Sequence, residues 1–380
     1  MVRVELKPKF IDWACGRIGV TPGMLEGRFP HLEEWRNNQV NPTLKQLETF
    51  AKYTRTPIGF FFLPEPPIEK IPIADYRTVE NEFIERPSAD LLDTIYLCQQ
   101  RQDWYRSYLR SNHEIEMAFV GAAKITDSVV QTAAAMRTAI GFSIEERRAM
   151  PTWTEALRRF IDIADMHGIM VMCSGVVLNN NQRKLNPAEF RGFALADKFA
   201  PLIFINGADT KAAQMFTLAH ELAHIWVGET GLSDPQAVRL PKNDIERWCN
   251  QVAAEFLAPL EMVKHEYDKK DELTRQVKRL SHIFKVSTLV ILRRIFDASG
   301  LSRDEFQVAY NKELKILSEV KKGSGGDFYL TQGARLGKRF AKALIVSTLE
   351  GHTLYRDAFK MLGFSKQETF QELGQKLGVV

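Results

Sequence analysis

An apolar stretch that carries two histidines four positions apart, Met215 to Trp226, most constrains how this chain can fold. It contains the run Phe216-Thr217-Leu218-Ala219-His220-Glu221-Leu222-Ala223-His224, and with it the pattern H-E-x-x-H. Apolar residues on most sides predict a largely buried helix, in which unpaired imidazoles cost free energy unless they are ligated or hydrogen-bonded. Residues i and i+4 lie one turn apart on one face, so His220 and His224 can both direct a ring nitrogen at one metal ion.

Glu221 follows the first histidine directly, and its role is predicted from its place on the same helix. It is rotated away from the two histidines but stays near enough to take a proton from metal-bound water, which is the task of a general base. Zinc in a catalytic site usually takes three protein ligands and leaves a fourth position to water. The sequence therefore predicts a zinc site with His220 and His224 as ligands. The alternative is a pair of histidines that only cap or pack on a buried helix.

The third ligand is expected further along, in a second amphipathic helix that begins near residue 245. Glu246, Asn250 and Ala253 fall on one face of this helix, at i, i+4 and i+7. Glu246 is predicted to supply a carboxylate oxygen, Asn250 to accept a hydrogen bond from the second nitrogen of a ligating histidine, and Ala253 to let the two helices approach. Glu255 is the rival third ligand, although it falls elsewhere on the helix. One apolar stripe faces the core: Ile245, Trp248, Cys249, Val252 and Phe256.

The rest of the chain predicts an α+β protein that is mainly helical. Three short β-rich runs, 169–172, 190–195 and 202–205, stand between helical segments, and Asp197-Lys198 turns the second run back on the third. We therefore expect a small antiparallel sheet beside the H-E-x-x-H helix. Prolines after residue 63 end a compact N-terminal helical unit. The expected domains are 1–67, then 68–300 with the zinc site, then a helical extension over 301–380.

Composition bears on the compartment and on the partners. No apolar run approaches the roughly 18 residues of a membrane span, and the charged N-terminus lacks the apolar core of a signal peptide. The 4 cysteines form no C-x-x-C pair, so neither a disulfide framework nor a thiolate zinc site is indicated. The expected compartment is the cytoplasm. A formal net charge of +4 permits nucleic-acid binding without requiring it.

These motifs together resemble the ImmA/IrrE metallopeptidase family. In that family a gluzincin-like H-E-x-x-H helix precedes a helix of pattern E-x-x-x-N-x-x-A-x-x-x-L-x-x-P. The first motif is His220 to His224 here. The second is matched by Glu246, Asn250, Ala253 and Leu257, with a helix-ending Pro259 one residue earlier than the pattern has it. Residues 191–195, 200–206 and 216–218 also resemble the family's sheet and its run into the zinc helix. Asp75-Tyr76-Arg77-Thr78 is similar to a linker motif of members that carry an N-terminal helix-turn-helix.

The resemblance implies a zinc endopeptidase that makes a limited, site-specific cut in a partner protein. The implied partner is a helix-turn-helix repressor or antitoxin, in stress-response, phage or toxin-antitoxin regulation. Residues 8–63 themselves resemble an XRE-type helix-turn-helix, with a recognition helix over about Pro30 to Asn37. Two carboxylates, Glu33 and Glu34, lie in that helix beside a single arginine, and phosphates repel them. DNA is therefore a doubtful partner, and packing, dimerisation or recognition of a repressor is the alternative.

Two classes of function remain open on the sequence alone. The first is the zinc endopeptidase with Glu221 as its general base. The second is a non-catalytic regulator that binds DNA or protein through the N-terminal module and keeps zinc for structure. They differ in one requirement, because only the endopeptidase needs Glu221 once the metal is held.

Overall fold

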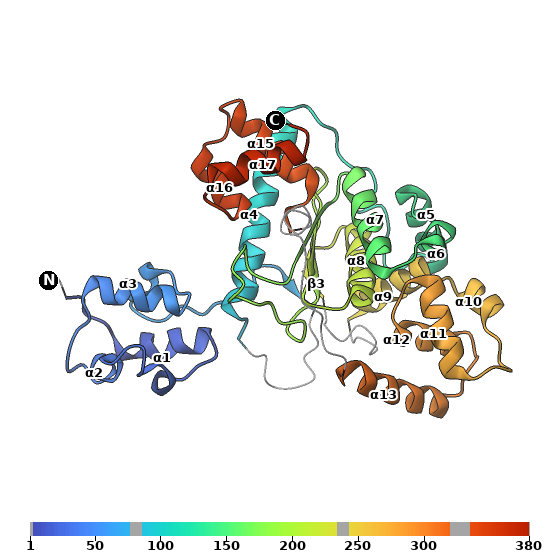
Figure 1. Cartoon of the computed structure of the whole chain (residues 1–380), viewed down its shortest axis with the longest axis horizontal. Helices are drawn as coiled ribbons and strands as arrows, with labels where there is room; N and C mark the ends of the chain where they lie inside the picture. Colours follow the sequence, from blue (N-terminus) through green and yellow to red (C-terminus); the bar gives the residue numbers. More distant parts are fainter. Residues whose placement is uncertain (1–2, 77–85, 234–242, 320–334, 380) are drawn as a thin grey trace. The chain divides into compact units, whose positions relative to one another are not determined.

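The computed structural model describes residues 3–76, 86–233, 243–319 and 335–379 (Figure 1). Arg77 and Thr78 of the linker motif lie outside these residues. The chain forms two compact units. The first runs through Pro72 and includes the start of helix α4 up to Ile95, and the second contains the segment from Ile73 and the chain from Tyr96 onward. The mainly helical α+β class predicted from the sequence is confirmed.

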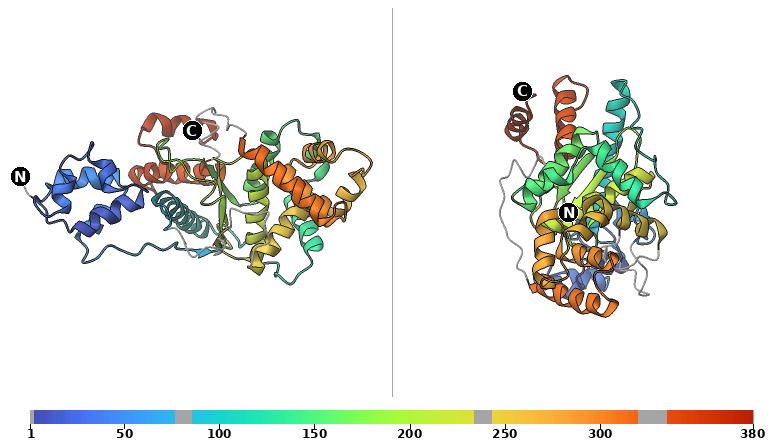
Figure 2. Two further views of the ribbon diagram at one scale, coloured as in Figure 1. Left: turned by 90° about the horizontal axis from the view of Figure 1, so that it is seen from below. Right: turned by 90° about the vertical axis from the view of Figure 1, so that its right-hand side faces the viewer.

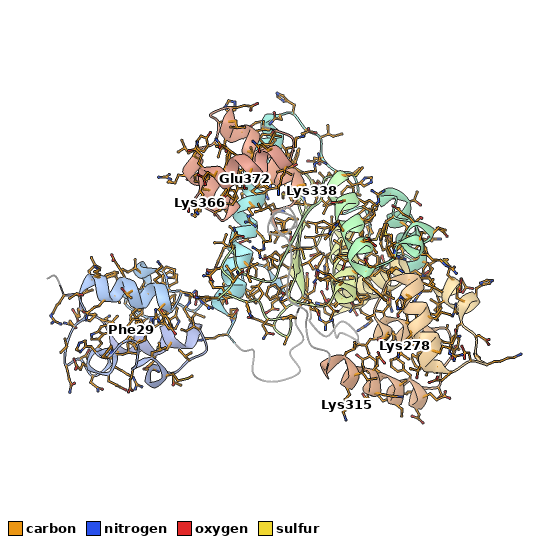
Figure 3. All side chains as sticks on the ribbon, viewed as in Figure 1. Phe29, Lys278, Lys315, Lys338, Lys366 and Glu372 are labelled. Atoms are coloured by element: carbon orange, nitrogen blue, oxygen red, sulfur yellow. The ribbon has the colours of Figure 1, made fainter. Side chains whose placement is uncertain are left out.

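The N-terminal unit is a small helical bundle around an aromatic core. Thr43 caps α3 by accepting from the Gln46 amide at 3.3 Å, while Gln46 Oε1 accepts from the Thr43 amide at 2.8 Å. Rings from several elements, among them Phe29 (Figure 3), fill the core. Its elements are α1 (Pro8–Arg17), η1 (Pro22–Leu25), α2 (Leu32–Arg36), α3 (Leu44–Tyr53) and η2 (Ile58–Phe62).

The second unit is built on a five-stranded mixed sheet of order β1-β5-β3-β4-β2. The predicted hairpin is confirmed, since β3 and β4 pair antiparallel with Phe193 opposite Phe204. The expectation of a wholly antiparallel sheet is wrong. β2 pairs with β4 rather than with β3, and β2 and β4 run parallel. The strands are β1 (Ala74–Asp75), β2 (Met170–Ser174), β3 (Gly192–Leu195), β4 (Leu202–Asn206) and β5 (Gly231–Leu232).

Helices cover both faces of this sheet (Figures 1 and 2). On one face, α7 and α8 join Ala194, Ile203 and Ile205 in the main hydrophobic core. On the other face, Arg101 of α4 donates to Met172 Sδ of β2 at 3.4 Å and also to the Met361 carbonyl at 3.0 Å. The helices of these layers are α4 (Ala89–Ser111), α7 (Trp153–Met166), α8 (Lys211–Val227), α15 (Lys338–Leu349), α16 (Tyr355–Leu362) and α17 (Gln367–Lys376).

The remaining helices include α9, which packs along α8 and against α5. Three arginines converge on the last carbonyls of α9, where a positive charge interacts favourably with the helix dipole. Arg137 donates to the Glu255 carbonyl at 2.7 Å, Arg147 donates to Leu257 O, and Arg294 donates to Ala258 O at 2.8 Å. No helix among the described residues is long and apolar enough to cross a membrane. The remaining helices of the second unit are α5 (Val129–Ile140), α6 (Ile144–Ala149), α9 (Asp244–Leu257), α10 (Leu260–Glu266), α11 (Leu273–Phe284), α12 (Thr288–Asp297) and α13 (Arg303–Glu319).

The C-terminal helices are anchored to α7 by two aspartates. Lys338, labelled in Figure 3, is the first residue of α15, and its Nζ lies 2.6 Å from Asp162 Oδ1. The next amide, of Arg339, donates to Asp165 Oδ1 at 3.3 Å, so a buried carboxylate serves as an acceptor for the first turn of α15. Burial raises the pKa of Asp165 to about 6, against the opposing effect of Arg339.

Asp165 should make the protein less stable as the pH rises from about 4 to above about 6. Its pKa is higher in the folded chain than in the unfolded chain, so its contribution to stability is complete below pH 4 and is lost as the pH passes 6. Asp165→Asn keeps the acceptor oxygen but cannot ionise. We expect the variant to be more stable at pH 7 by on the order of 1–3 kcal/mol and to show a smaller loss between pH 4 and 7. Urea unfolding at both pH values measures this, and equal pH slopes for the two proteins would contradict it.

Candidate metal centre and its surroundings

Two helices hold the residues at the centre of the candidate site. Thr210 caps α8 by accepting from the Ala213 amide at 3.2 Å, and the helix then runs through His220 and His224. Asn243 caps α9 by accepting from the Ile245 amide at 2.8 Å, which places Glu246 in the first turn of that helix. Since α8 and α9 pack along each other, the first turn of α9 meets the histidine-bearing turns of α8.

His220, His224 and Glu246 come together with their polar atoms facing one another. The two Nε2 atoms lie 3.1 Å apart. Glu246 Oε1 lies 2.9 Å from Nε2 of His224, and Glu246 Oε2 lies 3.4 Å from Nε2 of His220. All three side chains are buried. They are the group of three among the described residues whose ligand atoms converge as a metal site requires.

Charge and burial oppose each other in this group. Burial disfavours protonation of His220, but the Glu246 carboxylate outweighs it and raises the pKa of His220 to about 9. Burial lowers the pKa of His224, with Glu246 acting in the opposite direction. Burial also disfavours ionised Glu246, yet the two imidazoles hold the pKa of this carboxyl well below its usual range. A negative charge is thus stabilised at Glu246 by the positive charge beside it.

The donor set fits a zinc ion. Neighbouring ligands in a tetrahedral shell, with zinc–nitrogen distances of about 2.0–2.1 Å, are about 3.3 Å apart, and the three observed separations bracket that value at 2.9, 3.1 and 3.4 Å. Two imidazole nitrogens 3.1 Å apart can share at most one proton, so at least one of them presents a lone pair, which needs a hydrogen-bond donor or a cation. A cation would satisfy both nitrogens and the carboxylate together.

Glu221 lies beside this group in a tightly packed environment. Burial raises the pKa of Glu221 to about 8, partly offset by the nearby His220. Neither of its carboxylate oxygens has a hydrogen-bond partner of normal geometry among the described residues. Gly192 of β3 allows this placement, because a Cβ there would lie 2.5 Å from Thr217 Cγ2 and 3.1 Å from Glu221 Oε1. The buried carboxylate is therefore available to a proton donor that enters the site.

Asn250 lies near His220 in the candidate site, whereas Glu255 lies at the far end of α9. Asn250 lies close enough to His220 to contribute to its raised pKa, although the Asn250 amide and His220 Nδ1 form no hydrogen bond of normal geometry within the described parts of the chain. Glu255 is in the last turn of α9, where it forms an ion pair with Arg294 and accepts from the Leu260 amide at 3.2 Å. The rival third ligand is thus committed to a structural role.

Tyr76 also lies beside the site, a placement that the spacing of the sequence motifs does not predict. Its ring stacks on the His224 imidazole, with centroids 5.6 Å apart and planes inclined by 13°. Its amide donates to the Leu232 carbonyl at 3.0 Å, and Glu229 lies close enough to influence its phenol. Burial, together with Glu229, raises the pKa of Tyr76 to about 12, so the phenol stays protonated. The linker motif that contains Tyr76 was the only sequence signal for this residue. Because Tyr76 and His224 are not on one helix, no helical spacing connects them.

Two family models match parts of this chain. Residues 164–296 match the model of a peptidase family described as the IrrE N-terminal-like domain. That span contains His220, Glu221, His224, Glu246 and Asn250, whereas Tyr76 precedes it. Residues 336–376, which cover α15 to α17, match a domain of unknown function, DUF8813. No match to the chain was found among curated proteins.

Proposed function

We propose that this protein is a zinc-dependent endopeptidase that makes a limited cut in a partner protein, a helix-turn-helix repressor or antitoxin. The cluster of His220, His224 and Glu246 beside an uncommitted Glu221 carries the proposal. The match of residues 164–296 to a peptidase family supports it. The partner class follows from the resemblance of the motifs, and the N-terminal unit is proposed to contribute to recognition of that partner.

One feature favours catalysis over a purely structural metal. Structural zinc sites almost always use four protein ligands, whereas catalytic sites use three and keep one position open. Among the described residues, the group has three ligands. A second carboxylate, that of Glu221, lies beside it without joining the convergent set, and its burial would be costly with no task to perform. This argues against the non-catalytic regulator.

The residues then take separate tasks. His220, His224 and Glu246 would hold the metal, which when bound supplies Lewis-acid chemistry to a peptide carbonyl and to water. Glu221 takes a proton from the attacking water and delivers it to the leaving amine, as a general base and then a general acid. Because this carboxylate is buried, little solvent competes with it for that proton. We propose that Asn250, which lies near His220, accepts a hydrogen bond from the Nδ1–H of that ring in the metal-bound protein.

The proposal is tested with the full-length protein and a helix-turn-helix repressor encoded beside it. We expect the repressor to be converted into two defined fragments, which intact-mass spectrometry identifies. A chelator should stop the conversion, and added zinc should restore it, because the three ligands bind zinc reversibly. Intact repressor after incubation with zinc-loaded protein, tested over several such partners, would count against the endopeptidase.

A further inference from the structure

The sheet edge nearest the candidate metal centre is occupied by a segment of the chain itself. β5 follows α8 closely, and β1 pairs with it in parallel, Ala74 opposite Gly231 and Asp75 opposite Leu232. The pairing continues through the Tyr76 amide, which donates to Leu232 O. Residues 74–76 thus lie along β5 as an extended strand, with Tyr76 on the His224 ring.

The opposite edge of the sheet is covered in a different way. β2 packs against α15, and a Cβ on Gly337 would lie 3.4 Å from the Val171 carbonyl. That edge is therefore protected by a helix start, one usual way to block unwanted strand pairing. Of the two edges, the one along β5 adjoins the metal centre, and an extended peptide pairing there would run past His224.

Gly231 shapes this edge to accept a flat ring. A Cβ at Gly231 would lie 2.1 Å from Tyr76 Cε2 and 2.5 Å from Tyr76 Cδ2. The ring therefore lies directly on the backbone of Gly231 and is stacked on His224 as well. Any side chain larger than hydrogen at position 231 would displace it.

The covering strand is short enough to be displaced. β1 has two residues, both exposed, and Tyr76 is half-buried. Elements with few buried contacts open at low free-energy cost compared with the core. A competing strand that makes the same backbone hydrogen bonds and supplies its own aromatic ring could take this place.

We propose that the β5 edge is the docking position of an extended substrate peptide, that Gly231 and His224 form a subsite for one aromatic side chain of that peptide, and that residues 74–76 fill this position in cis until a substrate displaces them. This inference rests on the proposed function for the identity of the peptide as a substrate. The binding that it predicts needs no cleavage. Tyr76 therefore acts as a competitor of the substrate, and Gly231 determines specificity for aromatic residues.

The test uses a fluorescent peptide with the sequence of residues 70–78, Lys-Ile-Pro-Ile-Ala-Asp-Tyr-Arg-Thr, and the full-length protein in the presence of a chelator. Tyr76→Ala weakens the cis competitor, so the variant should bind the peptide roughly tenfold more tightly than the wild type, the upper range for one aromatic pair. Tyr76→Phe keeps the ring and should stay within about threefold of the wild type. Ile68→Ala, at a linker residue that is 85% exposed, is the matched control and should not change binding.

The subsite is tested by Gly231→Ala in the Tyr76→Ala background. The added methyl group occupies the space of the ring, so the double variant should lose the gain in affinity. A peptide with alanine in place of tyrosine leaves the aromatic subsite empty, so it should bind Tyr76→Ala more weakly than the tyrosine peptide does. Equal affinities of the wild type and Tyr76→Ala for the tyrosine peptide, or a double variant that binds as tightly as Tyr76→Ala, would overturn the proposal.

If Tyr76→Ala does not fold, hydrogen exchange of the wild-type protein tests the proposal instead. Excess tyrosine peptide should expose the Tyr76 amide to hydrogen exchange, and the alanine peptide should not. Unchanged exchange at a peptide concentration that saturates the protein would also overturn the proposal. If the peptide binds as expected but no partner protein is ever cut, the docking position stands and the endopeptidase proposal fails.

Discussion

Glu221→Gln is expected to abolish cleavage of the partner while leaving the protein folded and able to hold metal. Glutamine has the size and shape of glutamate, so the packing against Gly192 and Thr217 is retained. It cannot take the proton from the attacking water, and the loss of a general base typically reduces the rate by about 10²–10⁴-fold. The first-order rate of repressor cleavage, followed by intact-mass spectrometry, measures the effect.

Two controls make that result specific. Metal content and the unfolding temperature of Glu221→Gln should equal those of the wild type, because Glu221 lies outside the converging group of His220, His224 and Glu246. The variant should also still bind the repressor. If it gives the wild-type effect on the repressor's activity in cells, that effect comes from binding, and the non-catalytic regulator becomes the better description.

Glu246→Ala is expected to remove the metal. The wild type should hold about one zinc ion per chain. Loss of a ligand should weaken binding by more than roughly 100-fold, since the loss of a partner of a ligand alone costs about 10–100-fold. The variant also leaves His220 and His224 buried without their anion. Zinc should therefore raise the unfolding temperature of the wild type and not that of the variant, because a ligand stabilises only the state that binds it.

Glu255→Gln is the matched control on the same helix. It breaks the ion pair with Arg294 at the other end of α9, so it should lower the unfolding temperature while zinc content stays at the wild-type level. Metal analysis of the purified proteins by mass spectrometry separates the two variants. Loss of zinc from Glu255→Gln with retention in Glu246→Ala would exchange the roles of the two glutamates.

The parts of the site that the sequence could predict are those linked by helical spacing. His220, Glu221 and His224 share one helix, and Glu246 and Asn250 share the next, so a period of 3.6 residues is enough to place them on faces. Tyr76 could not be found in this way. It precedes His224 by more than a hundred residues, and only the pairing of β1 with β5 brings the two rings together.

The sheet was predictable in part for a similar reason. β2, β3 and β4 were recognisable from their β-branched and aromatic residues, and a turn at Asp197 indicated the hairpin. Strands buried on both faces show no alternation of polar and apolar residues, so nothing in the sequence indicated that β4 lies between β3 and β2. β1 and β5 have two residues each, which is too short for any periodic signal.

Arg101 limits how this protein can be divided for experiments. Its guanidinium is fully buried, and burial lowers the pKa of this arginine to about 10. Its main acceptor is a backbone carbonyl of α16, Met361 O, bound through Nε and Nη2 at 3.0 and 2.7 Å. A fragment that stops near residue 300 would leave that charge without its acceptor and would strip the rings of Phe340 and its neighbours from α4. An expression fragment for crystallisation or screening should therefore retain residues 335–379, even when only the candidate metal centre is of interest.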